Sequence, residues 1–439
     1  MNARVSVALG FLALIAVGAF LLACPWARAD GQWGEALPSL FAAFSSVCVT
    51  GLTVENTAAW SRPGQIVLLA LVEIGCLGLM TCGTFLLVAV GRRLSLNREF
   101  SLMDAYGTAK IKGLKGLVCW TVGSMLAIEA LGAVALWFRT RDVYESIFFS
   151  VMGFCNAGFS LYADSLARYA GDAPFLLVMA AETILGGIGF LCIYNLCTCC
   201  TGSGGGRRRR LSLHTRIVLK WTALFLALTF AMFLVLEWNG ALAQYDGAQK
   251  LAIGFYQSVT PRTCGFTVTP VESLEPLTRL GYAFLMFIGG APGSAAAGMK
   301  LTTFAVLLHT CAAMCRGDGE TVIMKHSVGA AVVRESIVIF VALAALATRV
   351  TAALLATEAV AVKAGAAKPE DLFFEAVSAV TTTGLSVGDT TRSLSTAGRC
   401  VLMAAMFCGR LGALTVVMLI GGREGSGRLR HPTGEVVVG

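Results

Sequence analysis

Long apolar runs separated by short polar segments dominate the pattern along this chain. A helix needs about 20 mostly apolar residues to cross a bilayer, so each run of that length predicts a membrane span. Eight runs qualify: Val5 to Cys24, Ile66 to Val90, Leu117 to Phe138, Phe175 to Cys197, Ile217 to Leu236, Gly281 to Leu308, Val332 to Ala356 and Val401 to Ile420. An even number of spans places both termini on one side of the membrane.

Four shorter apolar stretches lie between these spans and are too short to cross a bilayer. They run from Leu37 to Val47, Val143 to Phe154, Ala248 to Val259 and Leu372 to Val380. We interpret them as re-entrant half-helices that enter and leave the membrane on one face. Irregular backbone at membrane depth is tolerated only within protein or beside a water-filled cavity, so the segments after them are expected to line such a cavity.

A glycine follows each half-helix in a related setting, which indicates an internal repeat. The glycines are Gly51, Gly158, Gly265 and Gly384, and a Phe stands 10 residues before each of them: Phe41, Phe148, Phe255 and Phe374. We predict an all-α polytopic membrane protein with four span, pore-loop, span repeats in a pseudo-fourfold arrangement around a central ion pore. The expected repeats cover residues 1–90, 91–200, 201–310 (with an intramembrane gate loop) and 311–439 (with a C-terminal tail).

The composition agrees with a membrane protein. The chain has 439 residues, of which 56% are hydrophobic and 14% charged, and its mean hydropathy is +0.74. These values exclude an ordinary water-soluble globule. The 15 cysteines mostly fall inside apolar runs, so we expect them to be reduced rather than to form a disulfide framework. The cluster of Cys197, Cys199, Cys200 and His214 lacks a second paired motif and is interpreted as a Cys-rich helix end rather than a zinc site.

The net charge of +8 matters through its placement. Basic residues gather between the second and third spans and between the fourth and fifth; by the positive-inside rule these loops and both termini are cytoplasmic. The opposite loops carry acidic residues, which would concentrate cations at an outer pore mouth. Those acidic residues are Asp142, Glu145, Asp164, Asp172, Asp246, Glu272, Glu275, Glu370, Asp371 and Asp389. A sequence like a lipoprotein processing box ends at Cys24, and one like a signal-peptidase site ends at Ala29. Cleavage at either would remove the first span, which the repeat needs, so we expect neither to be processed.

The residues around the four glycines suit a cation-selectivity filter. Backbone carbonyls can replace the water shell of a potassium ion, and glycine reaches the φ > 0 conformations that aim carbonyls to one side. Half-helices ending there would direct the negative ends of their dipoles at a cation. The alternative is that the glycines are turn residues of an ordinary helical membrane protein. The candidate filter residues are Val49, Thr50, Gly51, Asn156, Ala157, Gly158, Thr263, Cys264, Gly265, Thr382, Thr383 and Gly384.

These motifs resemble the Trk/Ktr/HKT superfamily of potassium and sodium transporters, and the Ktr-type membrane subunit most closely. The segments that carry the resemblance are Val47 to Val54, Cys155 to Phe159, Ser258 to Phe266 and Thr381 to Leu385. Within that family, four filter glycines imply potassium permeation, whereas a Ser at the position of Gly51 is associated with sodium selectivity. Cys155 and Cys264 depart from the family pattern. With Cys48, they are expected to make the pore sensitive to external thiol reagents.

The resemblance also implies partners. A Ktr membrane subunit forms a homodimer that rests on a cytosolic ring of nucleotide-binding regulatory subunits, and the ending His431 to Gly439 resembles the tail at that dimer interface. The basic cytoplasmic loops suit such a contact or anionic lipid, and for Arg207 to Arg210 we prefer lipid or membrane orientation. Neither a nucleic-acid partner nor an organic cofactor on this chain is expected.

A run of small residues and helix breakers interrupts the second span of the third repeat. It consists of Gly289, Gly290, Ala291, Pro292, Gly293, Ser294, Ala295, Ala296, Ala297 and Gly298. Proline and glycine cost about 3 and 1 kcal/mol in a helix interior, which predicts a loop within the span. The resemblance implies that this loop gates the pore beneath the filter; the alternative is a kinked helix packed through small residues. A nucleotide P-loop is rejected because Met299 separates Gly298 from Lys300.

Arg410 lies within the last apolar span, where a charge is costly and usually functional. By resemblance it faces the gate loop; the alternative is a structural pair with Glu73 or Glu182. Lys300 is expected to face the cytoplasm and Arg262 to support the filter.

The predicted function is potassium uptake across a bacterial cell (inner) membrane, with sodium dependence left open. A sodium-permeable relative and a membrane enzyme are the alternatives. No Ser/His/Asp set or metal cluster supports an enzyme, with Glu129 and Glu182 as the only exceptions considered.

Overall fold

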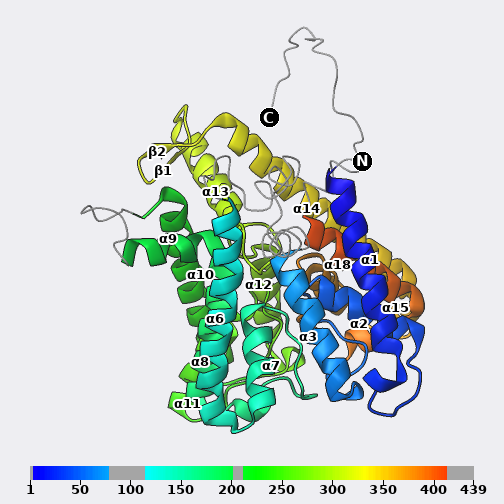
Figure 1. Ribbon diagram of the computed structural model, residues 1–439. Coiled ribbons are helices and arrows are strands. Elements are labelled where there is room, and N and C mark those ends of the chain that lie inside the picture. The colour runs from blue at the N-terminus through cyan, green and yellow to red at the C-terminus, as the bar shows by residue number, and fades with distance from the viewer. Residues whose placement is uncertain (1–2, 79–113, 201–210, 413–439) are drawn as a thin grey trace.

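The computed structural model describes residues 3–78, 114–200 and 211–412. Each of the first three repeats places a helix, a half-helix and a second helix in succession, and in the second and third repeats the second helix is broken into two (Figure 1). The first contains α1 (Ala3–Ala23), α2 (Ala36–Val47) and α3 (Arg62–Leu77). The second contains α6 (Leu114–Thr140), α7 (Val143–Phe154), α8 (Ala173–Ile188) and α9 (Phe190–Cys200). The third contains α10 (Leu213–Glu237), α11 (Gly247–Val259), α12 (Pro276–Phe287) and α13 (Leu301–Arg316).

The fourth repeat follows a small β-hairpin that the apolar pattern did not predict. Strands β1 (Val322–Ile323) and β2 (His326–Ser327) pair antiparallel, at the same end of the molecule as the start of α1 (Figure 1). The helices are α14 (Ala330–Thr357), α15 (Ala359–Lys363), α16 (Pro369–Val380), α17 (Thr390–Ser393) and α18 (Thr396–Leu411). Short 3-10 helices, η1 (Pro25–Ala27), η2 (Thr57–Ala59), η3 (Ala167–Tyr169) and η4 (Val271–Ser273), lie in the loops of the first three repeats.

The repeats interlock in a closed order. Within each repeat the first helix packs on the half-helix, in the pairs α1·α2, α6·α7, α10·α11 and α14·α16. Between repeats the second helix packs on the half-helix of the next, in the pairs α3·α7, α8·α11, α12·α16 and α18·α2. Because the last pair returns to the first repeat, the four half-helices surround a common centre. The predicted all-α fold of four repeats is confirmed.

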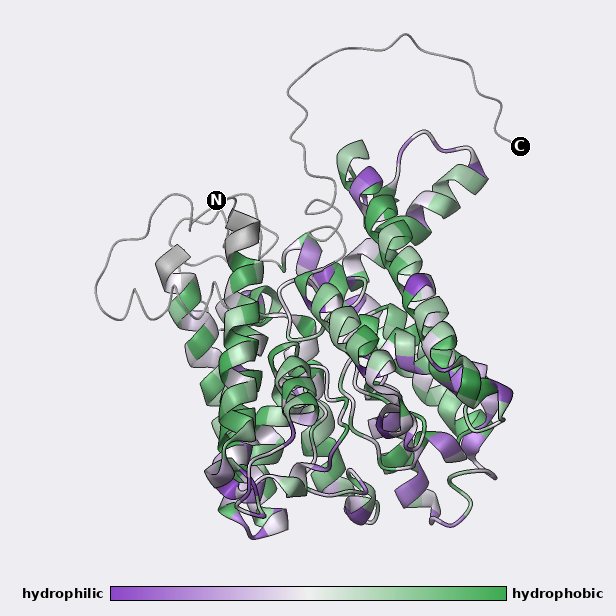
Figure 2. Ribbon diagram, turned by 90° about the vertical axis from the view of Figure 1, so that its right-hand side faces the viewer, coloured by the Kyte–Doolittle hydropathy of each residue, from purple (hydrophilic) through white to green (hydrophobic). Residues whose placement is uncertain are grey.

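The outer surface of the helices is apolar, as a bilayer requires. Figure 2 shows hydrophobic residues along the helices and hydrophilic residues mostly toward their ends. Exposed side chains include Phe20, Leu131 and Val235 on the first helices of three repeats. Among the described residues, three helices are long and apolar enough to span a membrane: Val118–Thr140, Leu213–Glu237 and Ala330–Thr357. The chain is therefore a membrane protein.

The second helix of the second repeat is broken at a position that the sequence did not indicate. The predicted continuous span from Phe175 to Cys197 is wrong: α8 and α9 meet at Gly189 with a bend of 100°. Gly189 has φ 88° and ψ 145°, a conformation open essentially to glycine, so the helix cannot continue through it. Helices α3 and α18 end at Gly78 and Gly412 with φ of 74° and 85°.

Several sequence predictions fall outside the described residues. These are the ends of the spans predicted to reach Val90 and Ile420, most of the basic residues between the second and third spans, Arg207 to Arg210, and the tail from His431 to Gly439.

Candidate functional site

Each half-helix ends in the same unusual backbone turn. Two residues with positive φ follow each half-helix, separated by one residue, and the second is always glycine. The first member is Val49 (φ 55°), Asn156 (φ 56°), Thr263 (φ 67°) or Thr382 (φ 48°), and the second is Gly51 (φ 92°), Gly158 (φ 72°), Gly265 (φ 82°) or Gly384 (φ 86°). Positive φ in β-branched Val49, Thr263 and Thr382 is strained, and such strain clusters at functional sites.

The peptide between the two positive-φ residues is tied back to its half-helix. The amide of Thr50 donates to the carbonyl of Ser45 at 2.8 Å, and that of Thr383 donates to Ser378 at 2.8 Å. The amides of Ala157 and Cys264 donate in the same way to Met152 and Thr260, at 3.0 and 3.1 Å. With their N–H groups engaged there, these four residues direct their carbonyls toward the neighbouring repeat.

The four glycines form a closed ring in which backbone meets backbone. A Cβ added to Gly51 would lie 2.3 Å from the carbonyl oxygen of Ala157, and one on Gly158 would lie 3.0 Å from that of Cys264. A Cβ on Gly265 would lie 2.7 Å from the oxygen of Thr383, and one on Gly384 would lie 2.0 Å from that of Thr50. Each glycine thus faces the next repeat, and the fourth faces the first. We call residues 49–51, 156–158, 263–265 and 382–384 the glycine ring.

Four peptide oxygens from four chain segments converge at this ring, along with the C-terminal ends of four half-helices. Each helix end carries roughly half a negative charge, so the centre favours a cation. The hydroxyls of Thr50, Thr263 and Thr382 are buried and have no hydrogen-bond partner among the described residues. The Thr383 hydroxyl is instead engaged with Thr381 at 2.8 Å.

Large side chains fix the ring from behind. The residues that follow the glycines, Leu52, Phe159, Phe266 and Leu385, are all at most 1% exposed. Of the matched phenylalanines, Phe41, Phe148 and Phe374 are buried, whereas Phe255 is only partly buried. A packed scaffold of this kind holds backbone oxygens at fixed separations.

A cavity of about 160 Å³ opens at the ring, and all four glycines line it; we call it the outer cavity, after the side to which the sequence assigns the neighbouring loops. Its wall also contains Thr53 and Asn56 from the first repeat, Ser160 from the second and Thr267 from the third. The wall is thus mostly polar, so water and hydrated ions can occupy it.

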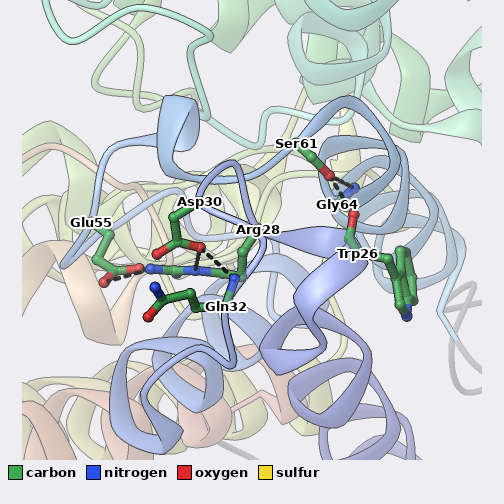
Figure 3. Close-up of polar contacts among 7 residues, drawn as sticks. All are labelled: Trp26, Arg28, Asp30, Gln32, Glu55, Ser61 and Gly64. Atoms are coloured by element: carbon green, nitrogen blue, oxygen red, sulfur yellow. Dashed lines mark hydrogen bonds and ion pairs between the residues drawn. The ribbon is translucent and has the colours of Figure 1, made fainter.

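The loop that follows Gly51 is fastened to the connection between α1 and α2 (Figure 3). Arg28 donates to the Glu55 carboxylate at 2.5 Å, and this hydrogen bond raises the pKa of Arg28. Nearby, the hydroxyl of Ser61 donates to the carbonyl of Trp26 at 2.7 Å and accepts from the amide of Gly64 at the start of α3. These contacts hold one wall of the outer cavity in place.

The outer mouth is less acidic than its residue types indicated. Asp172 pairs with Arg139 at 3.0 Å, and Asp371 pairs with Arg279 at 3.2 Å. Asp389 pairs with Arg392 at 3.0 Å, and Arg392 itself lines the cavity. These arginines offset part of the acidic charge that the sequence places there, and the concentration of cations at the mouth stays a prediction.

The cysteines near the ring also require a correction. Cys48, Cys155 and Cys264 are fully buried, and the Cys264 sulfur contacts the Thr183 hydroxyl at 3.3 Å. Their positions face the scaffold rather than the cavity, so the expected sensitivity to external thiol reagents through these residues is not supported.

We expect these three thiols to resist an impermeant maleimide applied from outside, because a buried thiol is not reached by a charged reagent. Mass spectrometry of peptides after labelling in intact membranes, with labelling after unfolding as the control, measures this directly. Rapid modification of Cys48, Cys155 or Cys264 in the folded protein would contradict the burial.

The candidate gate loop, residues 288–300, interrupts the second helix of the third repeat. An isolated bridge joins Ile288 to Met299 at its base, and the Met299 amide donates to Phe287 at 3.1 Å. Lys300 donates from Nζ to the carbonyl of Ala296 at 2.8 Å and so braces the loop, and its expected position facing the cytoplasm stays a prediction. The predicted interruption is therefore present as a structured loop rather than a kinked helix.

Arg410 joins this loop to the first repeat. Its guanidinium donates to the carbonyl of Ala295 at 2.8 Å and to the carbonyl of Gly75 at 2.6 Å. No ion pair links Arg410 to Glu73 or Glu182 within the described part of the chain, so the alternative of a structural pair does not hold. Arg262 is buried and donates to the Thr222 hydroxyl at 3.4 Å, close behind the third ring segment.

Sequence reasoning missed a set of contacts behind the ring. Gly75, Gly186 and Gly409 each stand three residues before a helix-ending glycine, in the pattern Gly-x-x-Gly. A Cβ on Gly75, Gly186 or Gly409 would lie 2.2, 1.9 or 2.1 Å from the carbonyl of Val47, Phe154 or Val380, the last residue of a half-helix. The recurring spacing in three repeats was a visible signal.

Buried and half-buried carboxylates form a second feature that the sequence did not bring together. Glu73, Glu129 and Cys155 place their polar atoms within 4.8 Å of one another. Ser150 donates to the Glu129 carbonyl at 2.6 Å and also contacts the Glu182 carboxylate. Glu129 and Glu182 thus belong to a polar network behind the second ring segment.

Comparison with known proteins shows which family this chain resembles. The model of the TrkH family, described as cation transport protein, matches residues 12–424. The chain is 34% identical to the Ktr system potassium uptake protein B of Bacillus subtilis, over 98% of this chain and 96% of that protein. It is 32% identical to the potassium/sodium uptake protein NtpJ of Enterococcus hirae, over 99% and 96% of the two chains.

A solved structure shares the fold. The crystal structure of the potassium transporter TrkH from Vibrio parahaemolyticus superposes with a TM-score of 0.76 at 18% identity, covering 95% of this chain and 84% of that one. The solved structure agrees with the fold, and the family model and the relatives agree with the resemblance carried by the ring motifs. The chain belongs to the TrkH family of cation transport proteins.

Proposed function

We propose that this chain is a potassium-uptake membrane subunit that conducts potassium through the glycine ring. The observation that carries the proposal is the closed contact of four glycines with four carbonyls, from Gly51 to Ala157 and around to Gly384 and Thr50. Peptide oxygens from four sides can replace the water shell of a potassium ion without a full charge that would trap it. The filter comprises the twelve residues of the ring.

Selectivity for potassium over sodium is part of the proposal. Every repeat has glycine at the ring position, and a relative at 34% identity is named a potassium uptake protein. A sodium-permeable transporter is the second candidate, because the relative NtpJ is named a potassium/sodium uptake protein. Sodium could also act as a coupled ion rather than a permeant one.

The 288–300 loop is proposed as the gate. The proposal that it lies on the side of the ring away from the outer cavity is supported by Arg410, which joins it to Gly75 at the C-terminal end of α3, whereas the loop before α3 lines that cavity. The positive charge of Arg410 would raise the barrier to a cation there. Opening then requires that residues 289–298 leave the path below the ring.

The oligomeric assembly and the location in the cell are proposed from membership of the family. The chain would work as a homodimer on a cytosolic ring of nucleotide-binding regulatory subunits, surrounded by membrane lipid. It would lie in the bacterial inner membrane with both termini in the cytoplasm. The repeat boundaries at residues 90, 200 and 310 belong to this proposal.

Complementation tests the function. Expression in a bacterium that lacks potassium uptake should restore growth at low external potassium, because the ring supplies a potassium pathway. Growth and rubidium uptake are measured with and without sodium, against an empty-vector control. Uptake of sodium without rubidium would favour the second candidate, and transport of neither ion by correctly inserted protein would contradict both.

A further inference from the structure

The break between α8 and α9 is bonded directly to the candidate gate loop. At the end of α8, just before the break, the carbonyl of Gly187 accepts from the amide of Ala291 at 2.9 Å, and that of Gly186 accepts from Ala295 at 3.1 Å. In the opposite direction, the amide of Phe190 donates to the carbonyl of Gly293 at 3.0 Å. Three backbone bonds therefore join this glycine-rich loop to the end of α8 and the start of α9.

The backbone at the break and the backbone of the loop are in close contact. A Cβ on Gly189 would lie 2.8 Å from the carbonyl oxygen of Pro292, and one on Gly290 would lie 2.8 Å from that of Gly187. The corresponding glycines of the first and fourth repeats, Gly78 and Gly412, meet nothing within 4 Å among the described residues. Of these three glycines, which share a backbone conformation, Gly189 of the second repeat is thus the one that lies against another described segment, the candidate gate loop.

Helix α9 begins at the residue that makes one of these bonds. It leaves α8 at 100°, and its Tyr194 ring meets Trp120 of α6 edge to face, with centroids 5.1 Å apart. Because Phe190 is the first residue of α9, a shift of α9 moves the Phe190 amide away from Gly293.

We propose that the α8–α9 break is the seat that positions the gate loop across the pore, and that displacement of α9 releases it. The inference rests on the proposed role of residues 288–300 as the gate. The seat belongs to the second repeat and the loop to the third, so the pore is closed by a contact between repeats. Residues 186, 187, 189 and 190 are positioning residues, since they act through the loop and not on the ion.

Two substitutions of one residue isolate the contact. Phe190→Pro removes the amide hydrogen that Gly293 accepts, and proline is tolerated at the first position of a helix. Phe190→Ala removes the same ring but keeps the amide. Both variants lose the contact with Phe154, so the difference between them reports the hydrogen bond.

The purified full-length chain in proteoliposomes, without a cytosolic partner, gives the readout. We expect rubidium flux through Phe190→Pro to exceed that through Phe190→Ala by roughly three- to tenfold, the effect of one backbone hydrogen bond. The rubidium-to-sodium ratio should not change, because the ring is untouched. Damage to folding would lower flux, whereas release of the loop raises it. Equal flux through the two variants, at equal amounts of inserted protein, would overturn the proposal that the α8–α9 break positions the gate loop.

A second pair keeps the test decisive if proline prevents insertion. Gly189→Ala and Gly78→Ala place alanine in similar backbone conformations, but only the former would meet the loop. Greater flux for Gly189→Ala supports the seat, and equal effects overturn it. If the wild type and Arg410→Ala also carried no rubidium, the proposed function would fail instead, so the two failures are distinguishable.

Discussion

Alanine in place of Gly384 or Gly51 should abolish potassium-selective uptake. The added Cβ would stand 2.0 Å from the Thr50 oxygen or 2.3 Å from the Ala157 oxygen, far inside van der Waals contact with rigid backbone. Both positions also have positive φ, which alanine disfavours. The segments must separate, and oxygens that have moved apart no longer match a dehydrated potassium ion. We expect at least a tenfold loss of rubidium uptake, with a smaller rubidium-to-sodium ratio in the flux that remains.

Flux in proteoliposomes measures both quantities. Gly247→Ala is the matched control, because Gly247 begins the third half-helix, is exposed, and has nothing within 4 Å of an added Cβ. It should insert normally and transport like the wild type. Full selectivity in Gly384→Ala would show that the ring does not contact the ion.

Arg410→Ala should raise flux through the closed protein. The variant loses two charge-assisted hydrogen bonds, to Ala295 in the loop and to Gly75 in α3, each worth about 1.5–3 kcal/mol. It also removes a positive charge below the ring. If the substitution lowers the free-energy barrier to ion passage by half the energy of one of these bonds, flux rises several-fold. If it lowers the barrier by the full energy of one bond, flux rises about tenfold or more.

Rubidium flux without a cytosolic partner checks this expectation. Arg399→Ala serves as the control, since Arg399 lies on the same helix but donates to the Arg392 carbonyl near the outer cavity. A rise in Arg410→Ala that Arg399→Ala does not share would support the gate. Unaltered flux in a correctly inserted Arg410→Ala protein would remove Arg410 from gating.

Local rules predicted the half-helices well. The apolar stretch from Val143 to Phe154 became α7 with the same bounds, and the stretch from Leu37 to Val47 gained a single residue in α2. Length and turn residues determine such elements, so they can be recognised within one repeat. The convergence of the four glycines also agrees with the repeat, because equivalent segments of a closed fourfold fold meet at its centre.

The misses share a physical cause, since each depends on contacts between repeats. The apolar run around Gly189 reads as one span, and the break shows only when Pro292 and Gly293 lie against it. The burial of Cys264 likewise follows from its neighbour Thr183 on another helix.

Localising the permeant ion is the most direct test of a shared conduit. Thallium or rubidium should be detected by anomalous diffraction or cryo-electron microscopy on the axis encircled by the carbonyls of Thr50, Ala157, Cys264 and Thr383. The density should weaken when sodium replaces potassium. Ion density away from this axis, or an axis filled by side chains while the protein still transports rubidium, would contradict the account.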